Sequence, residues 1–551
     1  MLDWQPHPRF RHYTRANTGE VVTGPVSPLG WTLGWEHGVL AGWRSGNIDI
    51  GVFREDELPE RHPPLVGIFG GYMYLNLSAS RVRALRLPGA DVELLTRAYV
   101  GDSSEAPPYV PEPSDTCAEC TAKTRRFAEW VLSSDGHPRQ NADSEVVEGL
   151  RASRDDLSAL TPAQLVERAR VAAGHTAAVV SRAAAVAVAC SIGPAAVERV
   201  CGAVDRPDLF MPLFSGLGGV ESSGGATALW HLSRVPEGPG FDAAMEQFLR
   251  RFGARGPNEY DIYRDVWETS PALVTELLRP LRRNPDAQPP EQVAARLATE
   301  RAAATDEMRA LLADDSATLA RFDAALRSGQ GFLRSREQYK TNLVKCLHEI
   351  RIPVRELGRR AAAEGAIEDP TDVMMLLADE LDRFVEEPSS FRSVLAERHG
   401  EFRTLSDFTP PFYLTDGNPP VEQWTRGRGD APVAIAAVGE TLSGIRACSG
   451  NGTGIARVVM SPADTRDIGP DDVLIAPHTD PAWTPLFLSV RAVVVETGAP
   501  NSHAAIICRE LGTPCVVSVT DATRRIPDGA RVSVDGSTGT VTVLDLERVS
   551  A

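Results

Sequence analysis

Lysine is nearly absent from this 551-residue chain. Only Lys123, Lys340 and Lys345 occur among its 57 basic residues, and the other 54 are arginines. A Gly-rich loop that binds nucleotide phosphates carries a lysine that contacts them. None of the three lysines follows a strand and a loop of that kind. The sequence therefore offers no phosphate loop for ATP.

Basic residues are fewer than acidic ones, 57 against 74, so the formal net charge is −17. This charge disfavours general binding to nucleic acid or to anionic lipid. The eight cysteines are scattered, and the only close pair, Cys117 and Cys120, stands in a Pro-rich segment. A structural zinc site needs about four ligands. We therefore expect no metal site, and we expect reduced thiols, as in the cytoplasm.

Long apolar runs are missing as well. The best candidate for a membrane span, residues 177–192, contains Arg182 and is shorter than the roughly 20 apolar residues that a span needs. It predicts a buried helix. Asp3, His7 and Arg9 interrupt the N-terminal segment, which disfavours a signal peptide. We expect a cytoplasmic protein that does not bind membranes.

The apolar pattern divides the chain into several parts. Residues 1–105 have short apolar runs with frequent Gly and Pro, which favours an irregular α+β entry segment. From about 125 to 405 apolar residues recur at helical spacing, which predicts helices. A Gly-rich stretch, 216–225, interrupts them and is predicted to be a turn. Residues 433–546 return to short strands and Gly turns, so the pattern predicts a multidomain protein.

One histidine near the C-terminus has an informative context. An apolar strand is predicted over 492–496, and a helix from about 502 to 511 follows it, ending before Gly512. Between them, this strand–turn–helix exposes His503 on a loop near the positive end of the helix dipole, where free N–H groups favour anions. Such an imidazole stays neutral and nucleophilic, and the dipole stabilises a phosphoryl group attached to it. The alternative is a buried or N-capping histidine.

Further motifs surround His503 in a fixed order. They are Thr479-Asp-Pro-Ala-Trp-Thr-Pro-Leu486, Gly498-x-x-x-Ser-His-Ala-Ala-Ile-x-x-Arg-Glu510, Gly512-Thr-Pro514, Asp528-Gly529 and Val534-Asp-Gly-x-x-Gly539. Together they resemble the phosphohistidine swivelling domain of the phosphoenolpyruvate-utilising enzymes. The resemblance implies that His503 carries a phosphoryl group between two sites and that Gly498, Ser502 and Arg509 belong to its loop. Ala499 stands where this family often has a second glycine.

Upstream motifs resemble the substrate domain of the rifampin phosphotransferase-like members of the same family. They are Asn17–Leu29, Tyr72–Asn76, Phe252–Glu259 and Asp369–Val373. The resemblance implies a substrate-binding domain over 1–425, mostly helical from about 125. A linker would cover 426–432, inside a Pro- and Gly-rich stretch that begins at 406. A small α/β phosphohistidine swivelling domain would then occupy 433–546.

Two pairs of charged residues are candidates for an acceptor site. Arg336 and Lys340 stand at i and i+4 on one helix face, where two cations repel unless an anion lies between them. A phosphoryl group suits this arrangement, and similar Arg-Glu-x-x-Lys patterns occur at the acceptor site of the proteins resembled. The alternative is a solvated face paired with Glu337. Arg255 and Glu259 form the second pair, for which helix-start chemistry is the alternative.

Enzymes of this family normally add an ATP-grasp domain, whose motifs this sequence lacks. The resemblance therefore implies a phosphotransferase component without a cofactor of its own. ATP and Mg²⁺ are expected on a separate ATP-grasp partner. A non-catalytic ligand-binding or regulatory protein derived from such an enzyme is the alternative. The sequence leaves the acceptor open, and His348 and His478 are predicted to be structural.

Overall fold

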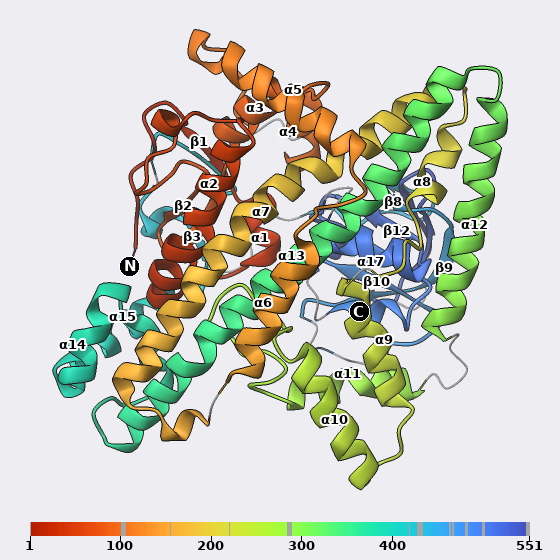
Figure 1. Ribbon diagram of the computed structural model, residues 1–551. Helices are drawn as coiled ribbons and strands as arrows, with labels where there is room; N and C mark the ends of the chain where they lie inside the picture. The colour runs from red at the N-terminus through yellow and green to blue at the C-terminus, as the bar shows by residue number, and fades with distance from the viewer. Residues whose placement is uncertain are drawn as a thin grey trace.

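The computed structural model describes residues 2–100, 106–154, 156–219, 221–283, 289–417, 419–426, 433–461, 464, 468–479, 483–498 and 502–546. Within them the protein is multidomain, with a mostly helical body followed by a C-terminal α/β region (Figure 1). The predicted linker, 426–432, lies outside the described residues except for Arg426.

Two long helices form the backbone of the helical body. Helix α7 (Pro162–Ala203) has 42 residues and α13 (Ser316–Ala363) has 48, and they pack side by side (Figure 1). They approach closely at Gly193 and Gly329, because a Cβ on Gly193 would lie 2.6 Å from the Cα of Gly329. The contact between backbones fixes α13, which carries Arg336 and Lys340.

Helix α7 contains the stretch whose hydrophobicity raised the question of a membrane span. Among the described residues it is the one helix long and apolar enough to cross a membrane by length and composition. Half of its most apolar stretch is buried inside the protein. It packs against α13, α2 (Ala41–Asp49) and the π-helical segment η1 (Gly30–Leu40). The buried helix predicted for this segment is confirmed.

The N-terminal region forms an antiparallel sheet in the order β2-β3-β1-β5. Its strands are β1 (His12–Thr14), β2 (Val66–Phe69), β3 (Tyr72–Asn76) and β5 (Tyr413–Thr415). Strand β5 lies in the Pro- and Gly-rich stretch that begins at 406. In the same stretch, β4 (Phe408–Thr409) and β6 (Thr425–Arg426) pair as a separate antiparallel sheet of two strands. Parts of the Pro- and Gly-rich stretch that precedes the predicted linker are therefore strands, and the prolines at 410 and 411 stand between two of them.

Shorter helices complete the body, in the order α1 (Thr18–Val21), α3 (Leu77–Arg86), α4 (Val92–Val100), α5 (Ala118–Ser133), α6 (Gln140–Ala152), α8 (Phe210–Leu213), α9 (Glu221–Ser233), α10 (Pro239–Phe252), α11 (Ala272–Arg283), α12 (Pro290–Leu311), α14 (Leu381–Glu386) and α15 (Arg392–Leu405). Helix α9 takes up half of the Gly-rich stretch predicted to be a turn. Only its first part, 216–219, is a loop. Cys117 and Cys120 form a disulfide at the start of α5, so the expectation of reduced thiols was wrong for this pair.

The C-terminal region is an eight-stranded sheet in the order β7-β14-β13-β9-β10-β11-β12-β8. Its strands are β7 (Thr441–Ser443), β8 (Ile445–Cys448), β9 (Asn451–Val458), β10 (Asp472–Ala476), β11 (Ala492–Val495), β12 (Cys515–Val517), β13 (Arg531–Asp535) and β14 (Thr540–Asp545). Strands β9 to β12 are parallel and the other pairs antiparallel. In β11, Val493 and Val495 face the core under α17 (His503–Leu511), and Val494 faces the opposite core. Burial on both faces explains its unbroken apolar sequence.

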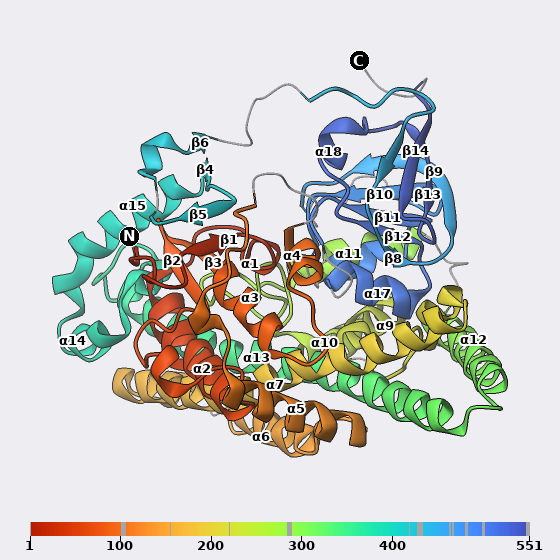
Figure 2. The ribbon, with the colours of Figure 1, turned by 90° about the horizontal axis from the view of Figure 1, so that it is seen from above.

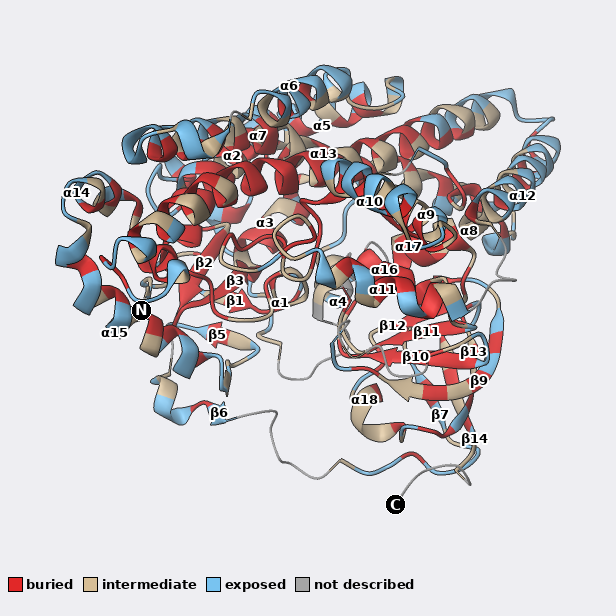
Figure 3. Ribbon diagram, turned by 90° about the horizontal axis from the view of Figure 1, so that it is seen from below, coloured by how far each residue is buried: buried red, intermediate tan, exposed pale blue. Residues whose placement is uncertain are grey.

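The C-terminal sheet rests on the helical body through its helices. Helix α17 contacts α9 and α12, and α16 (Thr484–Phe487) contacts α9 and α11. Viewed from above, α17 lies between the sheet and the long helices (Figure 2). Helix α17 and the central strands are mostly buried (Figure 3). The start of α17 is thereby brought to the helical body.

Candidate functional site

His503 is the first residue of α17, directly after the N-cap residue Ser502. The predicted strand and helix on either side of it are confirmed as β11 and α17. Its side chain is only 9% exposed, so the prediction of an exposed loop histidine was wrong. The reason is that the helical body covers the start of α17. The Thr484 hydroxyl lies 3.0 Å from Nε2 of His503 and fixes the ring.

The electrostatic environment of His503 keeps the imidazole neutral. Burial lowers the pKa of His503 well below its ordinary value, and the positive charges of Lys340, Arg255 and Arg336 lower it further. The carboxylate of Glu337 opposes them in part. A neutral imidazole has a free electron pair, so this histidine is a nucleophile at neutral pH.

Arg336 and Lys340 lie on α13 with a carboxylate between them. Nη1 of Arg336 is 2.5 Å from Oε1 of Glu337, and Nζ of Lys340 is 3.8 Å from the same oxygen. Glu337 is itself buried. The pairing with Glu337 that the sequence offered as an alternative is thus present, but on a buried face rather than a solvated one. Burial also lowers the pKa of Lys340.

Arg255 and Glu259 form a buried ion pair beside α13. Nη1 of Arg255 donates to Oε1 of Glu259 at 2.7 Å, and its Nη2 donates to the hydroxyl of Thr341 at 3.0 Å. Both residues lie in the non-helical segment after α10, so the helix-start alternative was wrong. The charges of Arg255, Arg336 and Lys340 all act on His503. Three segments distant in sequence therefore meet at this imidazole.

The remaining predicted loop residues have separate surroundings. The Ser502 hydroxyl is buried and has no hydrogen-bond partner among the described residues. Gly498 packs tightly, since a Cβ there would lie 3.0 Å from Val517 and 3.1 Å from the Ser502 hydroxyl. Arg509 donates from Nε to the Ala447 carbonyl at 2.7 Å, which attaches the other end of α17 to β8. Ala499 lies outside the described residues.

A cavity of about 410 Å³ opens beside Ser502. Arg336 and Glu20 share its polar end with Ser502. Its apolar walls come from α2, α3, α4, α7 and neighbouring segments, among them Trp43, Leu65, Leu75, Leu87, Leu95 and Val188. Burial raises the pKa of Glu20 to about 7, although Lys340, Asn17 and Arg336 act in the other direction. The cavity thus has mostly apolar walls and is lined near His503 by Ser502 and by Arg336, whose charge acts on the imidazole.

Sequence reasoning missed Glu20, Thr341 and Thr484 as members of this group. Glu20 and Thr484 stand inside motifs that the sequence analysis had already noted, so the signal was present without a role attached to it. Thr341 follows Lys340 directly, but it carries no pattern that would separate it from other helix residues. Their proximity to the site depends on how the segments pack.

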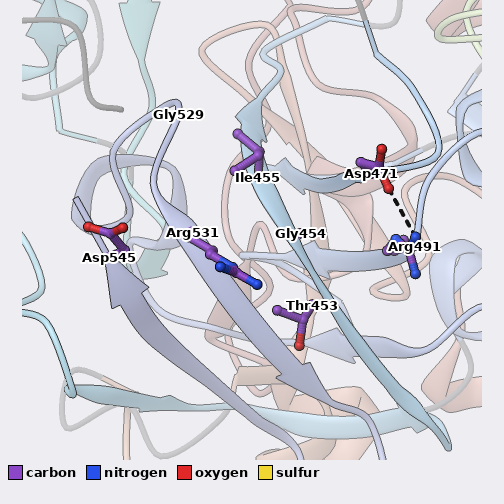
Figure 4. Close-up of a pocket in the computed structure, with 8 residues that line it drawn as sticks. All are labelled: Thr453, Gly454, Ile455, Asp471, Arg491, Gly529, Arg531 and Asp545. Carbon is purple, nitrogen blue, oxygen red and sulfur yellow. Dashed lines mark hydrogen bonds and ion pairs between the residues drawn. The ribbon is translucent and has the colours of Figure 1, made fainter. Parts of the chain in front are cut away.

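A second hollow, of about 560 Å³, lies on the C-terminal sheet (Figure 4). Asp471 and Arg491 form an ion pair at 2.9 Å on one side of it, and Arg531 and Asp545 lie on the other side. Asp471 and Arg491 precede β10 and β11, whereas the His503 loop follows β11. The hollow is therefore at the opposite end of the sheet from the imidazole.

Other histidines and possible metal ligands lie elsewhere. His348 is fully buried, and its ring pairs with Glu268 at 2.9 Å and with Arg351 at 3.0 Å, as a structural residue does. His478 packs its ring against Trp483. Among the described residues there is no group of three or more His, Cys, Asp or Glu that could hold a metal ion.

Two family models match parts of this chain. Residues 468–539 match the mobile domain of the PEP-utilising enzymes, and residues 232–337 match the fourth domain of rifampicin phosphotransferase. The first match contains the motifs around His503, and the second contains Arg255, Glu259 and Arg336.

Individual relatives agree with these matches. An uncharacterized protein of Mycobacterium tuberculosis is 27% identical over 98% of this chain. Rifampicin phosphotransferases of Streptomyces sviceus and of a Streptomyces species are 30% and 32% identical over 60% of it. The chain spans 62% of the length of the mycobacterial relative and 37% of each Streptomyces enzyme. The recognition made from the motifs is confirmed: this chain resembles rifampicin phosphotransferase, within the family of PEP-utilising enzymes, over residues 232–337 and 468–539.

Proposed function

We propose that this chain is a phosphotransferase component. His503 takes a phosphoryl group from a separate ATP-grasp nucleotide-binding partner, which holds ATP and Mg²⁺, and passes it to a small molecule. The similarity to rifampicin phosphotransferases supports this class of reaction. The observation that carries the proposal is the neutral, buried imidazole of His503 among three cations beside an apolar cavity. We expect the reaction to take place in the cytoplasm.

The chemistry needs positioning and charge neutralisation more than further covalent steps. As the acceptor oxygen bonds to phosphorus, the P–N bond to His503 breaks and its electron pair returns to the ring. Arg336, Lys340 and Arg255 neutralise the charge on the other phosphoryl oxygens. Glu337 and Glu259 hold these cations in place through the ion pairs described above. Burial excludes water, which would otherwise take the phosphoryl group.

The proton of the acceptor hydroxyl also needs a destination. Glu20 lines the polar end of the cavity together with Arg336 and Ser502. A carboxylate with a pKa of about 7 is suited to accept a proton near neutral pH. The imidazole is already neutral once the electron pair of the P–N bond has returned to it, so Glu20 releases the proton to the phosphorylated product or to solvent. The Ser502 hydroxyl, for which the described residues offer no hydrogen-bond partner, is available to the acceptor or to the phosphoryl group.

The walls of the cavity suggest the class of acceptor. Apolar side chains line most of the chamber, and its charged lining residues are few: Glu20, Arg83 and Arg336. Ligand sites with this distribution bind molecules through an apolar body and orient them through a few polar groups. We propose an acceptor with a largely apolar body and one hydroxyl directed at His503.

The test uses labelled ATP with the purified chain, with and without an ATP-grasp partner. Acid-labile label on the chain that requires both the partner and His503 supports the proposal. If the chain with the partner never becomes labelled, or if label is stable to acid, the chain is not a phosphohistidine carrier.

A further inference from the structure

The loop 215–218, between α8 and α9, presents backbone N–H groups to the mobile domain. Gly216 and Gly218 have φ angles of +55° and +66°, in the left-handed region that favours glycine. Successive N–H groups in such turns form a concave site for anions. Here the N–H groups of Leu217 and Gly218 donate to the carboxylate of Glu510, at 3.0 and 3.4 Å.

Two arginines occupy the carbonyl groups of the same loop. Arg301, on α12, donates to the carbonyls of Ser215, at 2.8 Å, and Gly216. Arg334, on α13, donates to the carbonyls of Leu217 and Gly218, at 2.8 and 3.1 Å. The two arginines therefore bind the carbonyl groups of the loop, and the N–H groups of Leu217 and Gly218 are left to bind an anion. The charges of Arg301 and Arg334 also act on Glu510.

Glu510 is coupled to His503 by the helix that carries both. They stand seven residues apart on α17, which is two turns, so they lie on the same side of the helix. Burial raises the pKa of Glu510, while the two N–H groups and the arginines lower it. The carboxylate of Glu510 is thus largely removed from water where it contacts the loop. No other part of the proposed chemistry uses it.

We infer that Glu510 is a positioning residue, whose contact with the loop 215–218 latches the mobile domain with His503 at the acceptor cavity. Rotation of the domain toward a donor then has to break this contact. The first part of the Gly-rich stretch thus binds an anion, which is a carboxylate of this chain. The role of this contact in phosphoryl transfer rests on the proposed function. The contact itself can be tested even if that function is wrong.

The first test measures access to His503 with phosphoramidate, a small reagent that phosphorylates imidazoles. In the latched protein His503 is only 9% exposed and should react slowly. Glu510→Ala removes two charge-assisted hydrogen bonds, and His503 should react at least about tenfold faster. Asp471→Ala, at an exposed carboxylate at the far end of the same sheet, is the matched control and should change nothing. Small-angle scattering should show that Glu510→Ala enlarges the protein and that the control does not.

A loop-side variant keeps the test independent of damage to α17. Arg334→Ala should have the same effect as Glu510→Ala, and the double variant should add little, because both act through one contact. Reaction rates and dimensions that stay at the wild-type values in both single variants overturn the latch. If the variants open the protein but no phosphoryl group ever passes through His503, the latch stands and the proposed function fails.

Discussion

The Thr484 hydroxyl and Nε2 of the His503 imidazole lie 3.0 Å apart and are both buried. The contact joins α16 to α17 and connects two motifs that the sequence shows separately. It holds one ring nitrogen at a fixed orientation. Because the ring is neutral and oriented, the direction from which a phosphoryl group can reach it is restricted.

Replacement of Arg336 or Lys340 by Met should slow discharge of the phosphohistidine far more than it weakens acceptor binding. Loss of one contact to the migrating phosphoryl group typically costs on the order of 3 kcal/mol, or roughly a hundredfold in rate. Loading of His503 should persist, since it takes place at the donor. Arg327→Met, at an exposed position of the same helix, is the control. Normal discharge in both variants would show that this helix face does not contact the phosphoryl group.

The pH dependence of discharge should report Glu20. Since Glu20 must be ionised to accept a proton, and since burial raises its pKa to about 7, the rate should rise as pH rises through about 7. Lys340 must stay protonated, and burial lowers its pKa, so the rate should fall again at alkaline pH. Glu20→Gln should remove the acid limb and slow discharge by about a hundredfold. An acid limb that persists in this variant would assign the proton to another group.

The crossing of α7 and α13 should be sensitive to one added methyl group. In Gly193→Ala the new Cβ would lie 2.6 Å from the Ala325 carbonyl and from the backbone of Gly329. Backbone atoms cannot move aside cheaply, so we expect a loss of about 1–3 kcal/mol in the free energy of unfolding. Gly174→Ala, on the same helix with nothing within 4 Å, should instead stabilise by up to about 1 kcal/mol. Urea unfolding compares the two, and equal effects would contradict the close crossing.

The isolated chain should not bind ATP tightly, because its sequence has no phosphate loop with a lysine. Calorimetry with the purified protein measures this directly. Micromolar binding, about −8 kcal/mol, would reveal a nucleotide site within this chain. The donor would then not have to be a separate protein.

Local patterns in the sequence predicted much of this structure. A short apolar run identified β11, and Gly512 identified the end of α17. Helical periodicity found α7 and α13, and the motif order identified the family. These features depend on residues close together in the chain, which is why sequence alone suffices for them.

Features that depend on packing between distant segments were not predictable. The pairing of β5 with β1 brings residues 413–415 into the first sheet, although they stand in a Pro- and Gly-rich stretch. Burial of His503 needs the helical body, and the role of Glu20 needs the cavity. The loop 215–218, which binds Glu510, was predicted only as a turn. The arginines that hold it come from α12 and α13, which are distant from it in sequence.

The most direct test of the account is replacement of His503 itself. With labelled ATP and an ATP-grasp partner, His503→Ala should abolish both the acid-labile label on the protein and its passage to any acceptor. Its circular dichroism and unfolding should match those of the wild type. His478→Ala, in the same domain, should keep both activities. If His503→Ala still transfers phosphoryl groups at the normal rate, His503 is not the carrier and the central claim is wrong.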